Sequence, residues 1–166
     1  MIKLHGSIDW REIPDDPLPR RISSELEKGI PNSDEVMIWP ASTKYRETQR
    51  DPYAQLAEIA RKALRPQLNK DLVLLVCGYS FGDSHINLEL DRALHESAGQ
   101  LAVLVFTSDE TLSGQLLDWN NDAAIRDQVL IFSRRGFFHG TCHSVSPSDL
   151  PWWKFEHVTR LLRGDR

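Results

Sequence analysis

Apolar and polar positions alternate along the chain with the spacing of strands in some segments and of helices in others. Residues 1–8 alternate as a strand does, and residues 35–39 form a second short apolar run. From residue 52 to about residue 69, apolar positions recur every three or four residues, which predicts a helix. Residues 72–77 and 101–106 are continuously apolar, as expected of central parallel strands that are covered on both faces.

Further helices are predicted between and after these strands. Asp83 is a plausible N-cap for a helix over about residues 84–97, and a second helix is expected at residues 113–120. A strand at residues 128–133 and a C-terminal helix that begins near residue 150 complete the pattern. Strands that alternate with crossover helices predict an α/β fold with a doubly wound, Rossmann-like and mostly parallel sheet.

One segment departs from this alternation. Residues 10–34 carry four prolines among mixed charges, which predicts a long connecting excursion rather than regular structure. The remaining pattern, together with a length of 166 residues and a hydrophobic content of 40%, predicts a single domain over residues 1–166.

Composition narrows the classes of protein to consider. The chain has 20 Lys and Arg against 24 Asp and Glu, a net charge of -4, and no long run of either sign, so a nucleic-acid or membrane surface is not implied. Cys77 and Cys142 are too far apart for a metal knuckle, and no disulfide framework is present. The lack of a disulfide framework fits a reducing cytoplasm, and the longest apolar run, at residues 72–77, is too short to span a bilayer. We therefore expect a cytoplasmic protein and no metal site.

Two short motifs stand out for chemistry. Residues 3–7 (Lys-Leu-His-Gly-Ser) end the first predicted strand, and residues 78–83 (Gly-Tyr-Ser-Phe-Gly-Asp) follow the strand at 72–77. Ligands of open α/β sheets bind at the carboxyl ends of strands, where a glycine turn brings backbone amides close to the ligand. His5 is the acid-base candidate, since its ordinary pKa lies near 6.5.

Structural interpretations of the same residues remain open. His5 could be a strand-end histidine that bonds to a backbone carbonyl. Gly78 and Gly82 could belong to an ordinary strand-to-helix turn, and Asp83 fits a helix cap better than a catalytic acid. The other histidines have no spacing typical of metal ligands.

Together the two motifs resemble those of sirtuins. The first is similar to the segment with the catalytic histidine, and the second to the ribose-binding turn. Extended to residues 78–87 (GYSFGDSHIN), the second motif most closely resembles sirtuin-like domains of bacterial anti-phage defence systems, in which NAD hydrolysis depletes the cofactor. Residues 37–45 (MIWPASTKY) fit the intervening strand and loop. The resemblance covers about residues 1–135.

The resemblance implies NAD as the substrate and His5 as the catalytic residue. Gly78 and Ser80 match residues that touch the ribose, and Tyr79 stands where conventional sirtuins usually have threonine. The residues implied in NAD binding are Gly6, Ser7, Gly78, Tyr79, Ser80, Phe81 and Asp83.

Two departures from conventional sirtuins matter. Residues 10–34 contain no cysteine and so replace the four-cysteine zinc module, which argues against deacylation and against bound zinc. A glycine-rich turn and a segment with a catalytic asparagine should come before the histidine motif, and neither does. We therefore expect the chain to be the C-terminal half of such a domain: a fragment, a product of a misplaced start, or the partner of another chain that supplies the first half.

The function expected from these residues is hydrolysis of the bond between nicotinamide and ribose, through an oxocarbenium-like state attacked by water, with His5 as general base. The alternatives are a catalytically silent module that binds a nucleotide or serves as a scaffold, and, with least support, an NAD-dependent protein deacylase. Besides NAD, the partners expected are an upstream segment or another chain; a homo-oligomer is a further option that the sequence leaves open.

Overall fold

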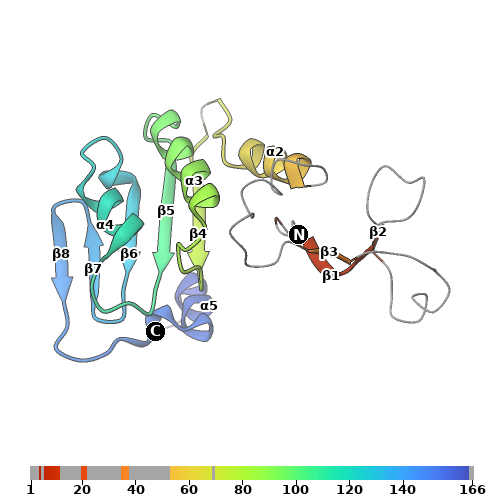
Figure 1. The fold of residues 1–166 in the computed structure, drawn as a ribbon. Coiled ribbons are helices and arrows are strands. Elements are labelled where there is room, and N and C mark those ends of the chain that lie inside the picture. The colour runs from red at the N-terminus through yellow and green to blue at the C-terminus, as the bar shows by residue number, and fades with distance from the viewer. Residues whose placement is uncertain are drawn as a thin grey trace. The chain divides into compact units, whose positions relative to one another are not determined.

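A computed structural model of the chain describes residues 4, 6–11, 20–21, 35–37, 53–68 and 70–164. The chain divides into two compact units, Met1–Ala63 and Leu64–Arg166, both drawn in Figure 1. Each unit has its own secondary structure. Most of the expected excursion at residues 10–34 lies outside the described residues, as does His5.

The first unit contains a small antiparallel sheet. Its strands are β1 (Gly6–Arg11), β2 (Arg20–Arg21) and β3 (Glu35–Met37), in the order β2-β1-β3. Trp10 pairs with Arg21 on one side of β1, and Gly6 pairs with Met37 on the other. Helix α2 (Tyr53–Ala63) follows, within the region predicted to be helical.

The position of β1 corrects one prediction. Gly6 and Ser7 were expected to close a parallel strand, whereas they open an antiparallel one that runs to Arg11. The alternation of apolar and polar residues continues past the predicted end, because Ile8 and Trp10 are separated by a polar residue. Alternation alone gives no signal for where a strand starts or which direction its neighbours take.

The second unit is built on a five-stranded mixed sheet of order β4-β5-β6-β7-β8. The strands β4 (Leu72–Cys77), β5 (Leu101–Phe106) and β6 (Val129–Phe132) are parallel, and Cys77, Phe106 and Phe132 lie level with one another at their carboxyl ends. Strands β7 (Gly136–His139) and β8 (Cys142–Val145) continue the sheet in antiparallel pairs. This α/β, Rossmann-like architecture confirms the fold class expected from the sequence.

Helices α3 (Ser84–Glu96) and α4 (Gly114–Asn121) connect the parallel strands and pack on one face of the sheet. Leu90 and Leu94 of α3 share a core with Trp119 of α4. The strand residues of that core are Leu101, Val103, Val105, Val129 and Ile131. Alternate residues of β5 face the two helices, so the sheet is fixed relative to them by buried apolar area.

Three features of this unit differ from the sequence-based expectations. Within the described part of the unit, β4 is an edge strand rather than a central one, and Val73 is 61% exposed. Strands β7 and β8 were not predicted. In β8 every residue is exposed, so the strand has no apolar pattern. The C-terminal helix is present as α5 (Phe155–Arg163), but it starts later than predicted, after the 3-10 turn η3 (Pro151–Trp153). None of the helices described is long and apolar enough to cross a membrane.

Candidate functional site

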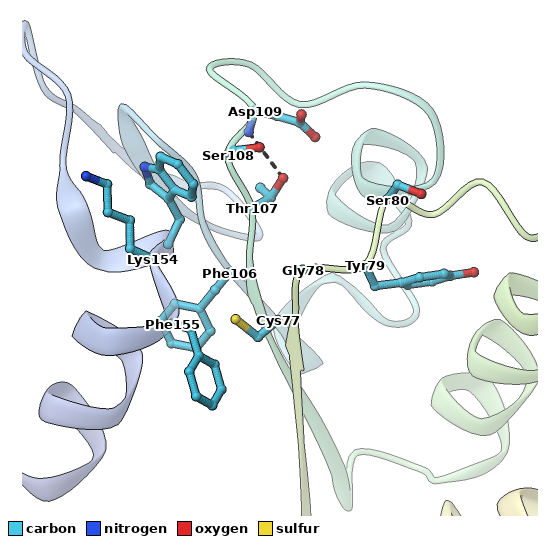
Figure 2. Close-up of a pocket in the computed structure, with 11 residues that line it drawn as sticks. Cys77, Gly78, Tyr79, Ser80, Phe106, Thr107, Ser108, Asp109, Lys154 and Phe155 are labelled. Atoms are coloured by element: carbon cyan, nitrogen blue, oxygen red, sulfur yellow. Dashed lines mark hydrogen bonds between the residues drawn. The ribbon is translucent and has the colours of Figure 1, made fainter. Parts of the chain in front are cut away.

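A cavity of about 490 Å³ lies at the carboxyl ends of β4 and β5. Figure 2 shows the strand ends converging there, and α5 lies beside the same edge in Figure 1. The volume of the cavity falls within the range of about 300–1,000 Å³ that is usual for small-molecule sites. Its described lining comes from three chain segments: Cys77, Gly78, Tyr79 and Ser80; Phe106, Thr107, Ser108 and Asp109; and Trp153, Lys154 and Phe155.

The first wall is the turn between β4 and α3. Gly78 has a φ of +71°, and a Cβ placed on it would meet nothing within 4 Å. The backbone of this turn is therefore open to a ligand without an intervening side chain. Phe81 also has a positive φ, of 56°, and its ring packs against Tyr79, with centroids 4.7 Å apart, and edge-on to Trp119. The turn is thus held in place by the helix core.

Hydrogen bonds close this turn from inside. The Tyr79 hydroxyl lies 2.9 Å from Asn87 Oδ1 and 3.2 Å from the Asp83 carbonyl, and either oxygen can accept its hydrogen bond. Asn87 Nδ2 donates to the Phe81 carbonyl at 2.8 Å, and Asn87 is only 8% exposed. Figure 2 shows the Tyr79 ring running away from the cavity. Its hydroxyl is hydrogen-bonded within the turn.

The Tyr79 hydroxyl stays protonated over the physiological range. Burial, and secondly the negative charge of Asp83, raise the pKa of Tyr79 to about 12, because both disfavour the phenolate. A phenol with this pKa donates a hydrogen bond but does not act as a base near neutral pH. Tyr79 can therefore donate the hydrogen bond that helps to close the turn.

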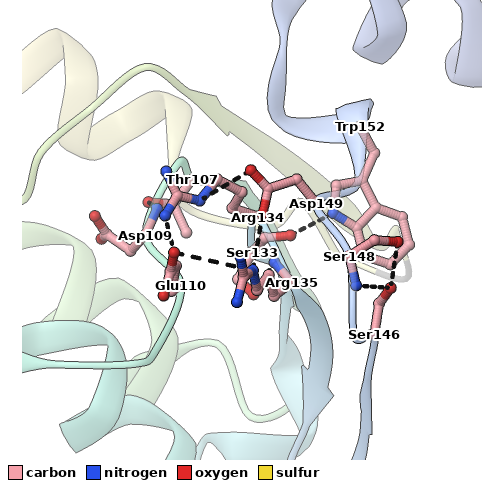
Figure 3. A network of polar contacts seen from close by, with 10 residues as sticks. All are labelled: Thr107, Asp109, Glu110, Ser133, Arg134, Arg135, Ser146, Ser148, Asp149 and Trp152. Atoms are coloured by element: carbon pink, nitrogen blue, oxygen red, sulfur yellow. Dashed lines mark hydrogen bonds and ion pairs between the residues drawn. The ribbon is translucent and has the colours of Figure 1, made fainter.

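The second wall follows β5. Thr107 Oγ1 accepts a hydrogen bond from the Asp109 amide at 3.2 Å, and the Thr107 amide donates to the Phe132 carbonyl at 3.0 Å. The Arg134 amide donates to the Asp109 carbonyl at 2.9 Å, and the Arg134 guanidinium pairs with Glu110. Figure 3 shows Thr107, Asp109, Glu110 and Arg134 within one polar network. The turn after β5 is fixed by residues from the turn after β6.

The third wall is the C-terminal segment around η3. The Trp152 indole donates to the Ser133 carbonyl and stacks edge-on against Phe132, with centroids 5.4 Å apart. Arg135 Nε donates to Asp149 Oδ1 at 2.8 Å (Figure 3), and this hydrogen bond lowers the pKa of the Asp149 carboxyl. These contacts hold the segment against the turn at 133–135, so that Trp153 and the two residues after it reach the cavity.

Sequence reasoning located part of this site. Gly78, Tyr79 and Ser80 line the cavity, whereas Phe81 packs into the core and Asp83 occupies the N-cap position of α3. The Asp83 side chain makes no capping hydrogen bond there, although its carbonyl accepts the first backbone bond of the helix from Asn87. The remaining candidates belong to the first unit: the backbone of Gly6 and Ser7 lies in β1, and His5 lies outside the described residues.

Two walls of the cavity were missed. Thr107, Ser108 and Asp109 follow a predicted parallel strand, and the rule that ligands bind at strand ends would have found them. The segment at 153–155 carries no comparable signal, because its place depends on contacts with residues distant in sequence. Within the part of the chain that the structure describes, no group of three or more His, Cys, Asp or Glu side chains could hold a metal ion.

An α/β unit with a glycine turn at the carboxyl edge of its sheet defines a class of nucleotide-binding folds. Residues 1–126, more than half of the chain, match the SIR2-like domain family, and the chain belongs to it. Membership of this family indicates a function related to NAD. No curated protein matches the chain.

Proposed function

We propose that this protein is a sirtuin-like NAD hydrolase that cleaves the bond between nicotinamide and ribose, and that it acts in bacterial anti-phage defence by depleting NAD. One observation carries the proposal: a chain of the SIR2-like family has a cavity at the carboxyl edge of its sheet, lined by the turn that resembles the sirtuin ribose-binding motif. The defence role rests on the resemblance of residues 78–87.

The cavity fits the ribose part of a dinucleotide. Gly78 leaves open space above its backbone, so a sugar can approach the turn closely. Ser80 on one wall, and Thr107 and Ser108 on the other, carry hydroxyls able to donate to and accept from ribose hydroxyls. A volume of about 490 Å³ accommodates a nucleotide half. Gly78 and Ser80 would orient the ribose.

We assign the general base to His5, on the strength of the motif at residues 3–7. In the proposed step the water oxygen bonds to the anomeric carbon, the carbon–nitrogen bond breaks, and its electron pair leaves with nicotinamide. His5 accepts the proton from water. A base placed in this way commonly contributes about 10²- to 10⁴-fold.

One observation favours a second candidate, a nucleotide-binding or scaffold module without catalysis. Among the described residues, no histidine lines the cavity, so the described lining offers no imidazole to act as a base near neutral pH. Deacylation has less support, since residues 10–34 hold no cysteine for a zinc module.

The test is nicotinamide release by the purified full-length protein, measured by chromatography for the wild type and two variants. His5→Ala should lower kcat by about a hundredfold or more, whereas Ser80→Ala should act partly through KM, since it removes one ribose contact. His143→Ala, an exposed histidine on β8, is the matched control and should keep full activity.

Two outcomes separate the candidates. A wild-type chain that binds ADP-ribose but releases no nicotinamide would favour the silent module. A His5→Ala variant that folds and keeps normal turnover would contradict the role given to His5. Thermal unfolding of each variant shows whether a loss of activity reflects a loss of fold.

A further inference from the structure

Phe155 is a large apolar residue whose side chain is exposed to solvent at the edge of the cavity. It is 69% exposed, it is the first residue of α5, and it lines the cavity together with Trp153. Figure 2 shows its ring beside Phe106 and close to Cys77, at the end of β4. An exposed aromatic ring in a concave site is a common element of ligand recognition, because it offers a flat apolar face.

The segment that carries these rings is anchored rather than free. Asp149 bonds to Arg135, the Leu150 amide donates to the Arg134 carbonyl at 2.7 Å, and Trp152 is fixed on Ser133 and Phe132. All of these anchors lie on the side of the segment that precedes Trp153. The backbone that carries the two rings is thus positioned before a ligand arrives, which lowers the entropic cost of binding.

Lys154, between the two aromatic residues, adds a positive charge to the segment. Lys154 Nζ lies 5.8 Å from the centre of the Trp153 ring, and in Figure 2 its side chain runs away from Cys77 and Gly78. A positive charge next to the indole disfavours a cationic ring at the same place, such as the pyridinium of nicotinamide nucleotides, and favours a neutral one. Among the lining residues that the structure describes, the one acidic residue is Asp109, on the opposite turn.

We infer that Trp153 and Phe155 form an aromatic wall that stacks on the neutral purine base of the ligand. This inference rests on the proposed function for the identity of the ligand, and it deepens that function by naming the part of the chain that recognises the base. Both residues lie beyond the matched region of residues 1–126, so the wall belongs to the C-terminal part of this chain and not to the matched family region.

Binding of ADP-ribose to the full chain tests the wall by calorimetry, without any need for turnover. Phe155→Leu keeps an apolar side chain but removes the flat ring, and Trp153→Ala removes the other ring. Each variant should bind ADP-ribose and AMP with about tenfold lower affinity. Trp153→Phe keeps a ring and should restore most of the affinity. Leu162→Ala, which alters an exposed apolar residue of the same helix outside the cavity lining, should have no effect.

The probes distinguish the possible failures. Ribose 5-phosphate, which has no base, and nicotinamide mononucleotide, which has the cationic ring, should bind all variants as they bind the wild type. The aromatic wall is contradicted if Phe155→Leu and Trp153→Ala lose affinity for nicotinamide mononucleotide but not for AMP. It is also contradicted if both variants bind ADP-ribose with normal affinity. In either case the proposed function is unaffected. If the wild type binds no ADP-ribose at all, the proposed function itself fails.

Discussion

The two turns that follow β4 and β5 line the same cavity but are held by different means. The turn after β4 is closed by Tyr79 and Asn87, within the turn and the first residues of its own helix. The turn after β5 is held from outside, by the backbone and guanidinium of Arg134.

This difference decides what each turn depends on. Changes inside the first turn leave buried hydrogen-bonding groups without partners, so they should be costly. The second turn relies partly on exposed ion pairs, which contribute little on their own and are screened by salt. We therefore expect the first turn to be sensitive to single substitutions and the second to tolerate them.

Asn87→Ala should have the largest effect. It removes the partner of the Tyr79 hydroxyl and of the Phe81 carbonyl at a site that is only 8% exposed, and should cost about 1–3 kcal/mol of unfolding free energy. Urea denaturation measures the loss. Asn121→Ala, at the exposed end of α4, is the control. Equal losses for the two variants would show that the first turn is not held by Asn87.

Gly78→Ala should come second. At a φ of +71° an alanine costs about 1–2 kcal/mol even though the space around its Cβ is open. Gly82→Ala is the matched control in the same turn, since its φ is not positive and its Cβ would meet Ser80 Oγ at an ordinary 3.4 Å. It should be neutral or stabilise by up to about 1 kcal/mol. Thermal unfolding of both proteins compares them, and the backbone argument fails if Gly82→Ala is the more damaging change.

Asp149→Asn should have the smallest effect. The pKa of Asp149 is lowered chiefly by the hydrogen bond from Arg135, so the folded state favours the carboxylate. Its contribution is present above the ordinary carboxyl pKa near 4 and is lost as the pH falls through the lower folded value. The wild type should therefore melt slightly higher than the variant at pH 7 and low salt, with the gap closing in acid and in 1 M NaCl. A gap that is unchanged by both treatments would point to a cause other than charge.

The sequence predicts the parts of the molecule that local pattern determines. The strands at 72–77 and 101–106 and the helix from Ser84 match the structure because their apolar runs and the turn at Gly78 are contiguous signals. Strand β8 has no such signal, since each of its residues is exposed.

The candidate site divides in the same way. Gly78 and Ser80 could be found from the turn alone, whereas Trp153 and Phe155 reach the cavity through contacts of Asp149 and Trp152 with the turn after β6. Such long-range contacts leave no periodic trace in the sequence. The catalytic role of His5 stays a prediction, because His5 lies outside the described residues.

The third wall of the cavity also has a consequence for the order in which the site is made. Domains fold as the ribosome releases them, from the N-terminus onward. A nascent chain synthesised through β6 already contains the two turns, but the residues at 153–155 are still inside the ribosome or not yet translated. The cavity therefore stays incomplete until residues 153–155 have also left the ribosome, and a chain that stops before them lacks its third wall.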